Sequence, residues 1–315
     1  MVFLKEKSIS GKKYFYLTKS IRLPGSGVKT IQKLVKKGEP REKFATWFEG
    51  QEIKIICDWA AKAYRKDSVF TEGKIRKIEE IRLNYKKILK KLSKNQLKDL
   101  FDRFTANFTY ESNAIEGNSL TLKDVAIVLF EKNVIKGKEL REIYETVNSR
   151  KVVDKILQKK FRVTETGMVK MHRVLVKNMD IPAGYKNVPN YVIGRAVETV
   201  LPERVDAEMK KLIHYFEENE KTIHPLQLAA KFHGKLEKIH PFEDGNGRVG
   251  RFMINVILVD KGYPPLIIRK TQRIAYFKCL EDFDNGYAEN LERFILEKYE
   301  DTFRKFFEIY LKYLK

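Results

Sequence analysis

Cysteine is scarce in this chain of 315 residues, which contains only Cys57 and Cys279. Two cysteines so far apart in the sequence argue against a disulfide framework and against a thiolate zinc site. We therefore expect both side chains to be free thiols, which suits a reducing compartment.

Long apolar runs are also missing. No stretch approaches the roughly 20 apolar residues that a bilayer-spanning helix needs. The first ten residues, MVFLKEKSIS, lack the apolar core of a signal peptide. Internal repeats and long flexible linkers are not evident either. These absences predict a cytoplasmic protein with one large or two modest domains and no membrane segment.

Acidic residues are in deficit, since 63 lysines and arginines face 42 aspartates and glutamates, for a net charge of +21. Basic clusters such as KTIQKLVKKGEPREK and NYKKILKKLSKNQLK interleave with apolar positions. One interpretation is solvated helix faces with long, extended basic side chains. The other is a surface for nucleic acid or an acidic partner, because such a charge excess attracts polyanions. Charge alone carries no site geometry, so the first interpretation is preferred.

Residues 1–40 differ from the rest of the chain. KKYFYLTKSIRL is rich in aromatic and β-branched residues, and a turn-like PGSG separates it from VKTIQKLV. This pattern predicts a small β-hairpin. The stretch GSGVKT imitates a phosphate-binding P-loop, but Val28 stands where a glycine should precede Lys29. We interpret it as a hairpin turn.

From residue 41 onward, apolar residues recur at spacings of three and four, so the fold class is predicted as mainly α. Thr121 and Asp124 have the spacing of a capping box. The helical pattern breaks at DIPAGYKNVPNYVIGRAVETVLPERV, which predicts an exposed hairpin or flap. We expect a helical extension over 41–104, a helical core over 105–300 and a helix end over 301–315.

The stretch IHPFEDGNGRVGRFMINVILVDKG contains the Gly-x-Gly-x-x-Gly spacing of a dinucleotide-binding turn. A dinucleotide fold needs a buried strand running into the first glycine. Here Leu228, Phe232, Leu236 and Ile239 are instead at helical spacing. The expected structure is therefore helix, short loop, helix, and the dinucleotide interpretation fails.

The second of these helices is predicted to begin near Asn246 or Gly247 and to be buried, because it is apolar almost all round. Its glycine-rich first turn points free N–H groups and a positive dipole end at an anion, and Arg248 and Arg251 lie on one side of it. Phosphate is the natural ligand of such a turn. His240 is placed to act as a general base, and Asp244 offers a hard oxygen ligand for Mg²⁺. Phe242 is expected to pack inward.

The stretch HPFEDGNGRVGR, from His240 to Arg251, resembles the signature of the Fic (Fido) family, HPFx(D/E)GNGRxxR, with each specified position filled. The resemblance implies a Fic fold and an enzyme that moves AMP from ATP to a Ser, Thr or Tyr hydroxyl of a target protein and releases pyrophosphate. It implies that His240 is the general base and that Asp244 binds Mg²⁺. The nucleotide-binding residues that it implies in this stretch are Asp244, Gly245, Asn246, Gly247, Arg248, Val249, Gly250 and Arg251.

A second stretch, SNAIEG from Ser112 to Gly117, resembles the family's inhibitory pattern (S/T)xxxE(G/N). The resemblance implies that Glu116 pairs with Arg251, blocks the γ-phosphate position and holds the enzyme off. The pairing is chemically credible, because carboxylate and phosphate compete for the same guanidinium. The same glutamate is a candidate for positioning a water that removes AMP.

The predicted flap, residues 184–194, is similar to the family's β-hairpin, which pairs with an extended target segment and covers the nucleotide. Its Lys186 stands near a position where many relatives carry arginine. Downstream, RIAYFKCLEDFDN resembles the segment that packs against adenine, whereas His172 is interpreted as structural. The further nucleotide-binding candidates are Tyr191, Val192, Ile193, Gly194, Tyr276, Phe277 and Asn285.

Two alternatives remain beside an autoinhibited protein adenylyltransferase with ATP and Mg²⁺ as cofactors. One is an enzyme of the same class that uses another nucleotide or mainly removes AMP. The other is a basic nucleic-acid-binding regulator built on a Fic scaffold. A homodimer is a further possibility that the sequence leaves open.

Overall fold

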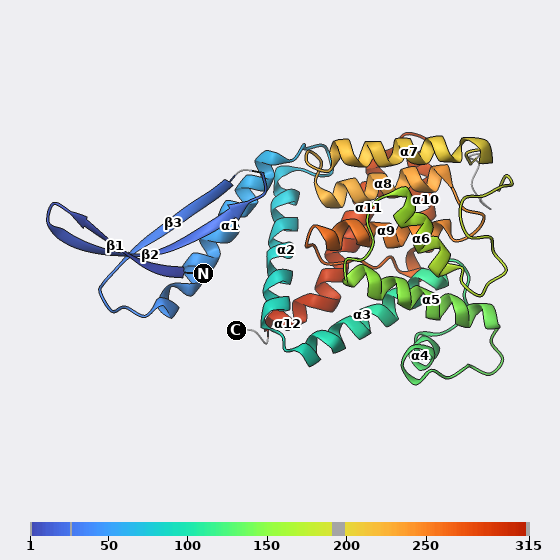
Figure 1. The fold of residues 1–315 in the computed structure, drawn as a ribbon, viewed down its shortest axis with the longest axis horizontal. Helices are drawn as coiled ribbons and strands as arrows, with labels where there is room; N and C mark the ends of the chain where they lie inside the picture. Colours follow the sequence, from blue (N-terminus) through green and yellow to red (C-terminus); the bar gives the residue numbers. More distant parts are fainter. Residues whose placement is uncertain (1, 26, 191–198, 313–315) are drawn as a thin grey trace.

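A small antiparallel sheet and a larger helical body lie at opposite ends of the molecule (Figure 1). The computed structural model describes residues 2–25, 27–190 and 199–312. Helix α1 (Ala45–Ala63) packs against the sheet, and α2 (Glu72–Lys91) runs between α1 and the other helices. In the described parts of the chain, none of the helices has the length and apolar character needed to cross a membrane.

The sheet has three strands in the order β1 (Val2–Ile9), β2 (Lys12–Leu23) and β3 (Gly27–Val35). Ser10 and Gly11 have positive φ angles of 50° and 78°, as the two-residue turn between β1 and β2 requires. The predicted hairpin is confirmed as β2 and β3, and β1 adds a strand that was not predicted. Charged residues obscure the alternation of β1, so its strand character was hidden in the sequence.

The helical prediction for the rest of the chain is confirmed. Helix α3 is continuous across residues 104 and 105, where a boundary between extension and core was expected, and the predicted capping box of Thr121 and Asp124 opens α4. The elements from the end of the sheet onward are η1 (Arg41–Phe44), α1, α2, α3 (Lys94–Ile115), α4 (Leu122–Ala126), η2 (Ile127–Glu131), α5 (Leu140–Leu157), α6 (Glu165–Leu175), α7 (Pro202–Asn219), α8 (Pro225–Ile239), α9 (Asn246–Asp260), η3 (Lys270–Gln272), α10 (Arg273–Asp284), α11 (Ala288–Thr302), η4 (Phe303–Phe307) and α12 (Glu308–Lys312).

Helix α9 lies at the centre of the body, packed against α8, and all its residues from Arg248 to Val259 are buried. Two glycines allow the helices to approach closely. A Cβ atom at Gly250 would lie 2.5 Å from His233 Nδ1 of α8, and one at Gly234 would lie 2.7 Å from the Phe283 ring of α10. The prediction that the helix after the glycine-rich loop is buried is therefore confirmed.

Candidate active site

A short loop joins α8 to α9 and fixes the start of α9. His240 ends α8 in a left-handed conformation with φ of 51°, and Gly245 begins α9 with φ of 83°. Between them, the Asn246 side chain binds the Phe242 backbone twice, accepting from its N–H at 2.8 Å and donating to its carbonyl at 2.7 Å. Asn246 was predicted to hold phosphate. Its buried side chain is instead used to shape the loop, so that prediction is wrong for the side chain.

His172 of α6 packs against this loop. Its ring stacks on buried Phe242 with centroids 4.1 Å apart and planes 7° apart. Its Nε2 donates to the Asp244 carbonyl at 2.9 Å, and its Nδ1 accepts from the Gly184 N–H at 3.3 Å. This hydrogen-bond pattern assigns a neutral ring. The predicted structural role of His172 and the inward packing of Phe242 are both confirmed.

The buried ring of His172 predicts a pH dependence of stability. Burial lowers the pKa of His172 from 6.5 to about 4. Between these values the unfolded chain binds a proton that the folded chain does not, so stability is full above pH 6.5 and falls as the pH drops toward 4. The loss should reach about 3 kcal/mol. Urea unfolding at pH 7.5 and pH 4.5 should therefore show a smaller difference in His172→Gln, since glutamine does not titrate. An unchanged difference would contradict this assignment.

His240 stands at the entrance of the loop, where 15% of its side chain is exposed. Its Nδ1 lies 3.3 Å from the Glu237 carbonyl oxygen and 3.9 Å from the Glu237 Oε2. A proton on Nδ1 would be donated toward Glu237, which leaves the basic lone pair on Nε2. The imidazole is thus oriented by the last turn of its own helix. Glu237 was not predicted, although its position three residues before His240 was a usable signal.

The two arginines of the motif are buried beside the first turn of α9. Arg248 lies 3.2 Å from Glu145 Oε1 and 3.4 Å from Asp244 Oδ1. Its Nε is buried and has no hydrogen-bond partner within the described ranges. An unsatisfied buried donor is costly, so a site that leaves one open suits an anionic ligand.

Arg251 is held by the last turn of α3. Its Nε donates to Ser112 Oγ at 3.1 Å, and its Nη2 donates to the Ser112 carbonyl at 2.9 Å and to Glu116 Oε1 at 2.7 Å. Burial alone lowers the pKa of the guanidinium, but the Glu116 carboxylate raises it above its ordinary value, so Arg251 stays charged. The predicted contact between Glu116 and Arg251 is therefore confirmed. Its inhibitory effect stays a prediction.

Gly247 explains how Glu116 comes so close to the start of α9. A Cβ atom at Gly247 would overlap the Glu116 carboxylate and lie 2.9 Å from Arg251 Nη1. The carboxylate therefore lies directly against the first turn of α9, where an anion would meet the helix N-terminus. Only glycine leaves room for it there.

Asp244 is the motif carboxylate that directly precedes the phosphate-binding turn and could hold a metal. Its side chain is 41% exposed, and its Oδ2 accepts from Arg141 Nη2 at 2.6 Å. Within the described residues, no three metal-ligating side chains cluster together. A single accessible carboxylate beside a phosphate-binding turn fits Mg²⁺, which takes one or two carboxylates together with phosphate oxygens and water. Arg141 was missed because nothing in the sequence links it to a residue 103 positions away.

The structure contradicts one of the predicted adenine contacts. Tyr276 is fully buried, with its ring stacked on His233 at 5.8 Å and its hydroxyl 2.8 Å from His233 Nε2. Its predicted stacking on adenine is wrong. Phe277 is half-buried under the Arg273 guanidinium at 4.8 Å, and Asn285 is exposed at the end of α10. The roles of these two residues stay predictions.

Val249 and Gly250 were also expected at the nucleotide, and the structure contradicts both. Val249 is fully buried, and its N–H donates to the Gly245 carbonyl at 2.9 Å. Gly250 is buried against α8. Val249 belongs to the hydrophobic core, and Gly250 lies on the side of α9 that faces α8.

The described part of the flap is tied to the active-site loop. The Lys186 N–H donates to the Pro241 carbonyl at 2.9 Å, and Asn190 Nδ2 donates to the Phe242 carbonyl at 2.8 Å. The Lys186 amine is buried and donates to Asn190 and Thr199, and burial lowers its pKa to about 8. It is thus not an exposed cation. The predicted contacts of Tyr191, Val192, Ile193 and Gly194 lie outside the described residues.

Among protein families, the Fic/DOC family matches residues 162–258 of this chain. Relatives include protein adenylyltransferase Fic of Drosophila grimshawi, 33% identical over 199 residues, which covers 61% of this chain and 41% of the relative. Protein adenylyltransferase fic-1 of Caenorhabditis elegans is 31% identical over 206 residues, covering 63% and 40%. The chain thus spans about two fifths of the length of these curated relatives.

Solved structures support the fold. A Fic-domain signalling protein from Bacteroides thetaiotaomicron superimposes with a TM-score of 0.66 at 25% identity, over 71% of this chain and 93% of that one. Fic-1 of Caenorhabditis elegans gives a TM-score of 0.65 at 23% identity, over 86% and 78%. The Fic fold and the mainly α class predicted from the sequence are confirmed.

Proposed function

We propose that this chain transfers AMP from ATP to a hydroxyl group of a target protein, and that Glu116 restrains the reaction. The single observation that carries the proposal is the loop after α8, which puts the His240 imidazole beside the donor-rich start of α9. The names of the relatives, protein adenylyltransferases, support the same reaction class. The target protein is identified here only by the hydroxyl that it must offer.

His240 acts as the general base in this proposal. It accepts the proton of the incoming hydroxyl at Nε2 while Nδ1 faces Glu237. The hydroxyl oxygen then forms a bond to the α-phosphorus, the bond from that phosphorus to the bridging oxygen breaks, and pyrophosphate leaves. The proton stays on His240 until solvent removes it. Because the imidazole is held by α8, little reorientation is needed.

The backbone N–H groups at the start of α9 and the two buried arginines hold the phosphates. They stabilise charge that develops on the transferred group, which is the main catalytic contribution that a site without covalent chemistry can make. Asp244 would hold Mg²⁺, which neutralises phosphate charge when bound. To do so, its carboxylate must exchange the Arg141 contact for the metal.

Glu116 restrains the reaction by occupying Arg251. The carboxylate lies where the terminal phosphate would approach the guanidinium and repels it. ATP can still enter, but its triphosphate is then displaced from the position in which the α-phosphorus faces the hydroxyl. The proposed inhibition is therefore competition for one arginine.

Two labelled forms of ATP test the reaction class. The chain and its Glu116→Gly variant are incubated with Mg²⁺ and ATP labelled on either the α- or the γ-phosphate, alone and with a cell extract as acceptor. AMP transfer labels protein only from the α-position and releases one pyrophosphate per AMP transferred. Label from the γ-position alone would instead identify a kinase, and label from neither would reject nucleotide transfer.

A second reaction at the same site is favoured by the position of Glu116. Its side chain is 33% exposed, so one carboxylate oxygen can orient a water while the other stays near Arg251. This would hydrolyse the AMP linkage of a modified protein. Purified AMP-modified protein distinguishes the two reactions. Glu116→Gly should lose AMP removal while it gains AMP addition, whereas parallel changes in both would reject removal by Glu116.

A further inference from the structure

The N-terminal region carries far more than its share of positive charge. Residues 1–44 contain twelve lysines and arginines and three glutamates, so they account for nine of the 21 net charges. Between residues 2 and 35, Glu6 is the only acidic residue. The charge is therefore concentrated on the small sheet, away from the helical body that holds the active site (Figure 1).

The alternation of β2 divides the sheet into two faces. Leu17 and Ile21 are buried on the face that packs on α1, so the even-numbered residues of β2 lie on the opposite face. Glu6 pairs in register with Phe15, which packs toward α1, and so belongs to the covered face. We call the opposite face the open face. Its strands contribute no acidic residue.

Aromatic and basic residues alternate on the open face. Tyr14 and Tyr16 lie at its centre, and the register places Lys7 opposite Tyr14 and Lys5 opposite Tyr16. The Lys7 ammonium lies 5.0 Å from the Tyr16 ring centroid, which confirms that both side chains share this face. The other side chains that the register places there are Phe3, Ile9, Lys12, Thr18, Ser20, Arg22, Val28, Thr30, Gln32 and Leu34.

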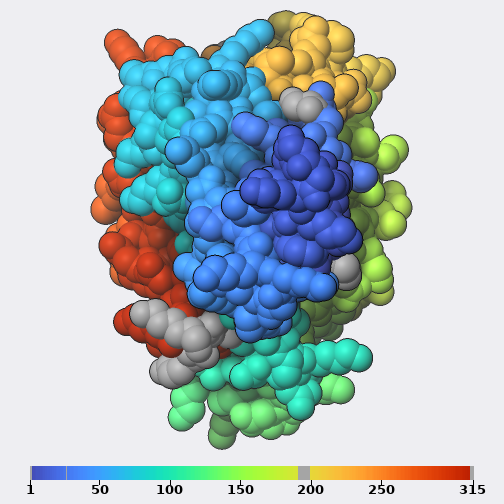
Figure 2. Space-filling view, turned by 90° about the vertical axis from the view of Figure 1, so that its left-hand side faces the viewer, coloured from blue at the N-terminus to red at the C-terminus, as the bar shows by residue number. Residues whose placement is uncertain are grey.

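Much of the open face is exposed, although Thr18 at its centre is buried. Phe3 is 45% exposed and Leu34 is 55% exposed on this face. Figure 2 views the molecule from the sheet end and shows the N-terminal strands, in dark blue, in front of the helical body. A ligand can therefore reach these residues without meeting the active-site loop.

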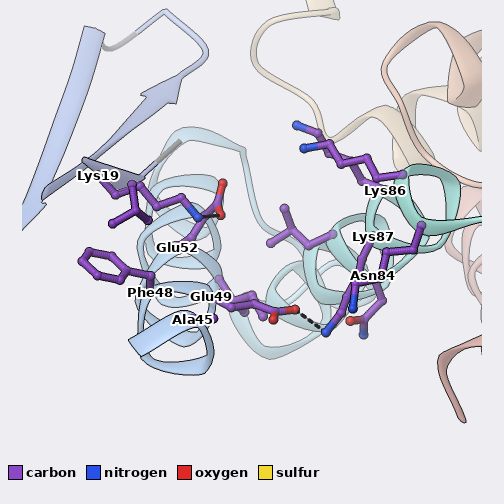
Figure 3. Close-up of a pocket in the computed structure, with 13 residues that line it drawn as sticks. Lys19, Ala45, Phe48, Glu49, Glu52, Asn84, Lys86 and Lys87 are labelled. Atoms are coloured by element: carbon purple, nitrogen blue, oxygen red, sulfur yellow. Dashed lines mark hydrogen bonds and ion pairs between the residues drawn. The ribbon is translucent and has the colours of Figure 1, made fainter. Parts of the chain in front are cut away.

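A second lysine-rich area differs from the open face because some of its lysines pair with carboxylates. It is a hollow of about 330 Å³ between α1 and α2 (Figure 3). Two of its lysines are already neutralised, because Lys19 pairs with Glu52 and Lys87 with Glu49, both at 2.6 Å. The described strands of the open face contribute no carboxylate to it. Its charge is thus directed at an external anion.

We propose that the open face binds single-stranded nucleic acid. Lysines and arginines along a strand attract a phosphate backbone, and the release of counterions makes that attraction strong at low salt. Neighbouring tyrosines on one face of a strand, about 7 Å apart, offer stacking surfaces to successive bases. An acidic protein would use the lysines but not the partly exposed tyrosine rings. A membrane surface would favour a continuous apolar face, which the interleaved lysines interrupt.

Fluorescence anisotropy of the full chain with labelled 20-nucleotide single strands, RNA and DNA, and with the matching duplex tests this proposal. We expect Tyr14→Ala with Tyr16→Ala to weaken single-strand binding about tenfold or more. Tyr14→Phe with Tyr16→Phe should preserve it, because phenylalanine also stacks. Lys5→Gln with Lys7→Gln should weaken binding and reduce the slope of log affinity against log salt by about 1.4.

The matched control is Lys123→Gln with Lys136→Gln, which removes the same charge from exposed positions on the helical body. It should leave the affinity unchanged, and all variants should keep the AMP-transfer activity of the parent chain. An equal loss of affinity in this control would show that net charge alone causes the effect, and would overturn the proposal. Tighter binding of the duplex, or equal affinity for polyglutamate, would overturn it too. Thermal unfolding of the variants shows whether the sheet is intact, and the phenylalanine pair decides the case if the alanine pair does not fold.

Discussion

Replacing Glu116 with glycine is expected to increase AMP transfer by about 10-fold to about 100-fold. The Glu116 carboxylate, whose side chain is 33% exposed, makes a charge-assisted hydrogen bond at 2.7 Å to the buried Arg251 guanidinium. A bond of that kind contributes about 1.5–3 kcal/mol, and the terminal phosphate of ATP must displace it. Without the carboxylate, the guanidinium is open to phosphate. Initial rates of label incorporation from α-labelled ATP, at equal protein concentrations, measure the change.

Two glutamine variants control for the loss of charge. Glu116→Gln keeps the size of the side chain and should give an intermediate gain, because an amide still occupies the site but attracts Arg251 weakly. Glu243→Gln removes an exposed carboxylate from the active-site loop, where no pairing with Arg251 occurs, and should change the rate little. If both glutamine variants gained activity equally, the effect would come from general electrostatics and not from the pair with Arg251.

Replacing His240 with alanine is expected to abolish this gain. In the Glu116→Gly background, the rate should fall by about 10²-fold to about 10⁴-fold, the usual contribution of a positioned general base. ATP affinity, measured by calorimetry, should change little, because the phosphate contacts come from α9 and its arginines. The effect should therefore appear in the rate constant of transfer and not in nucleotide binding.

His214 supplies the matched histidine control. It lies on α7 with 71% of its side chain exposed and lies 3.1 Å from Glu218 of the same helix. His214→Ala in the same background should keep full activity. Retention of more than about a tenth of the rate in His240→Ala would show that another group or water takes the proton, and the assignment of His240 would then fail.

Much of the site could be predicted because its parts are local in sequence. His240, Asp244, Gly245 and the two arginines lie within twelve residues, and a helix after a short glycine-rich loop brings them together with little choice of geometry. The apolar character of α9 also required burial, which the structure confirms. The pair between Arg251 and Glu116 spans 135 positions and could be predicted only from a resemblance.

The wrong predictions share a physical cause. Tyr276 and Val249 lie on helices whose orientation is set by packing with α8, and the sequence does not show which side of a mostly apolar helix faces a ligand. Asn246 was expected to bind phosphate because of the resemblance to the Fic signature, but its side-chain amide instead closes the loop by binding the backbone. Arg141 and Glu145 come from α5, and only the tertiary fold brings them to the loop.

Arg251 has a further property that follows from its contacts with Ser112. Two of its three hydrogen bonds to α3 go to the hydroxyl and carbonyl of Ser112, and only one goes to Glu116. When the carboxylate departs, these two bonds still fix the guanidinium in its present rotamer. Activation then requires no reorganisation of the arginine itself. The free energy needed to relieve inhibition is therefore only that of moving the Glu116 side chain.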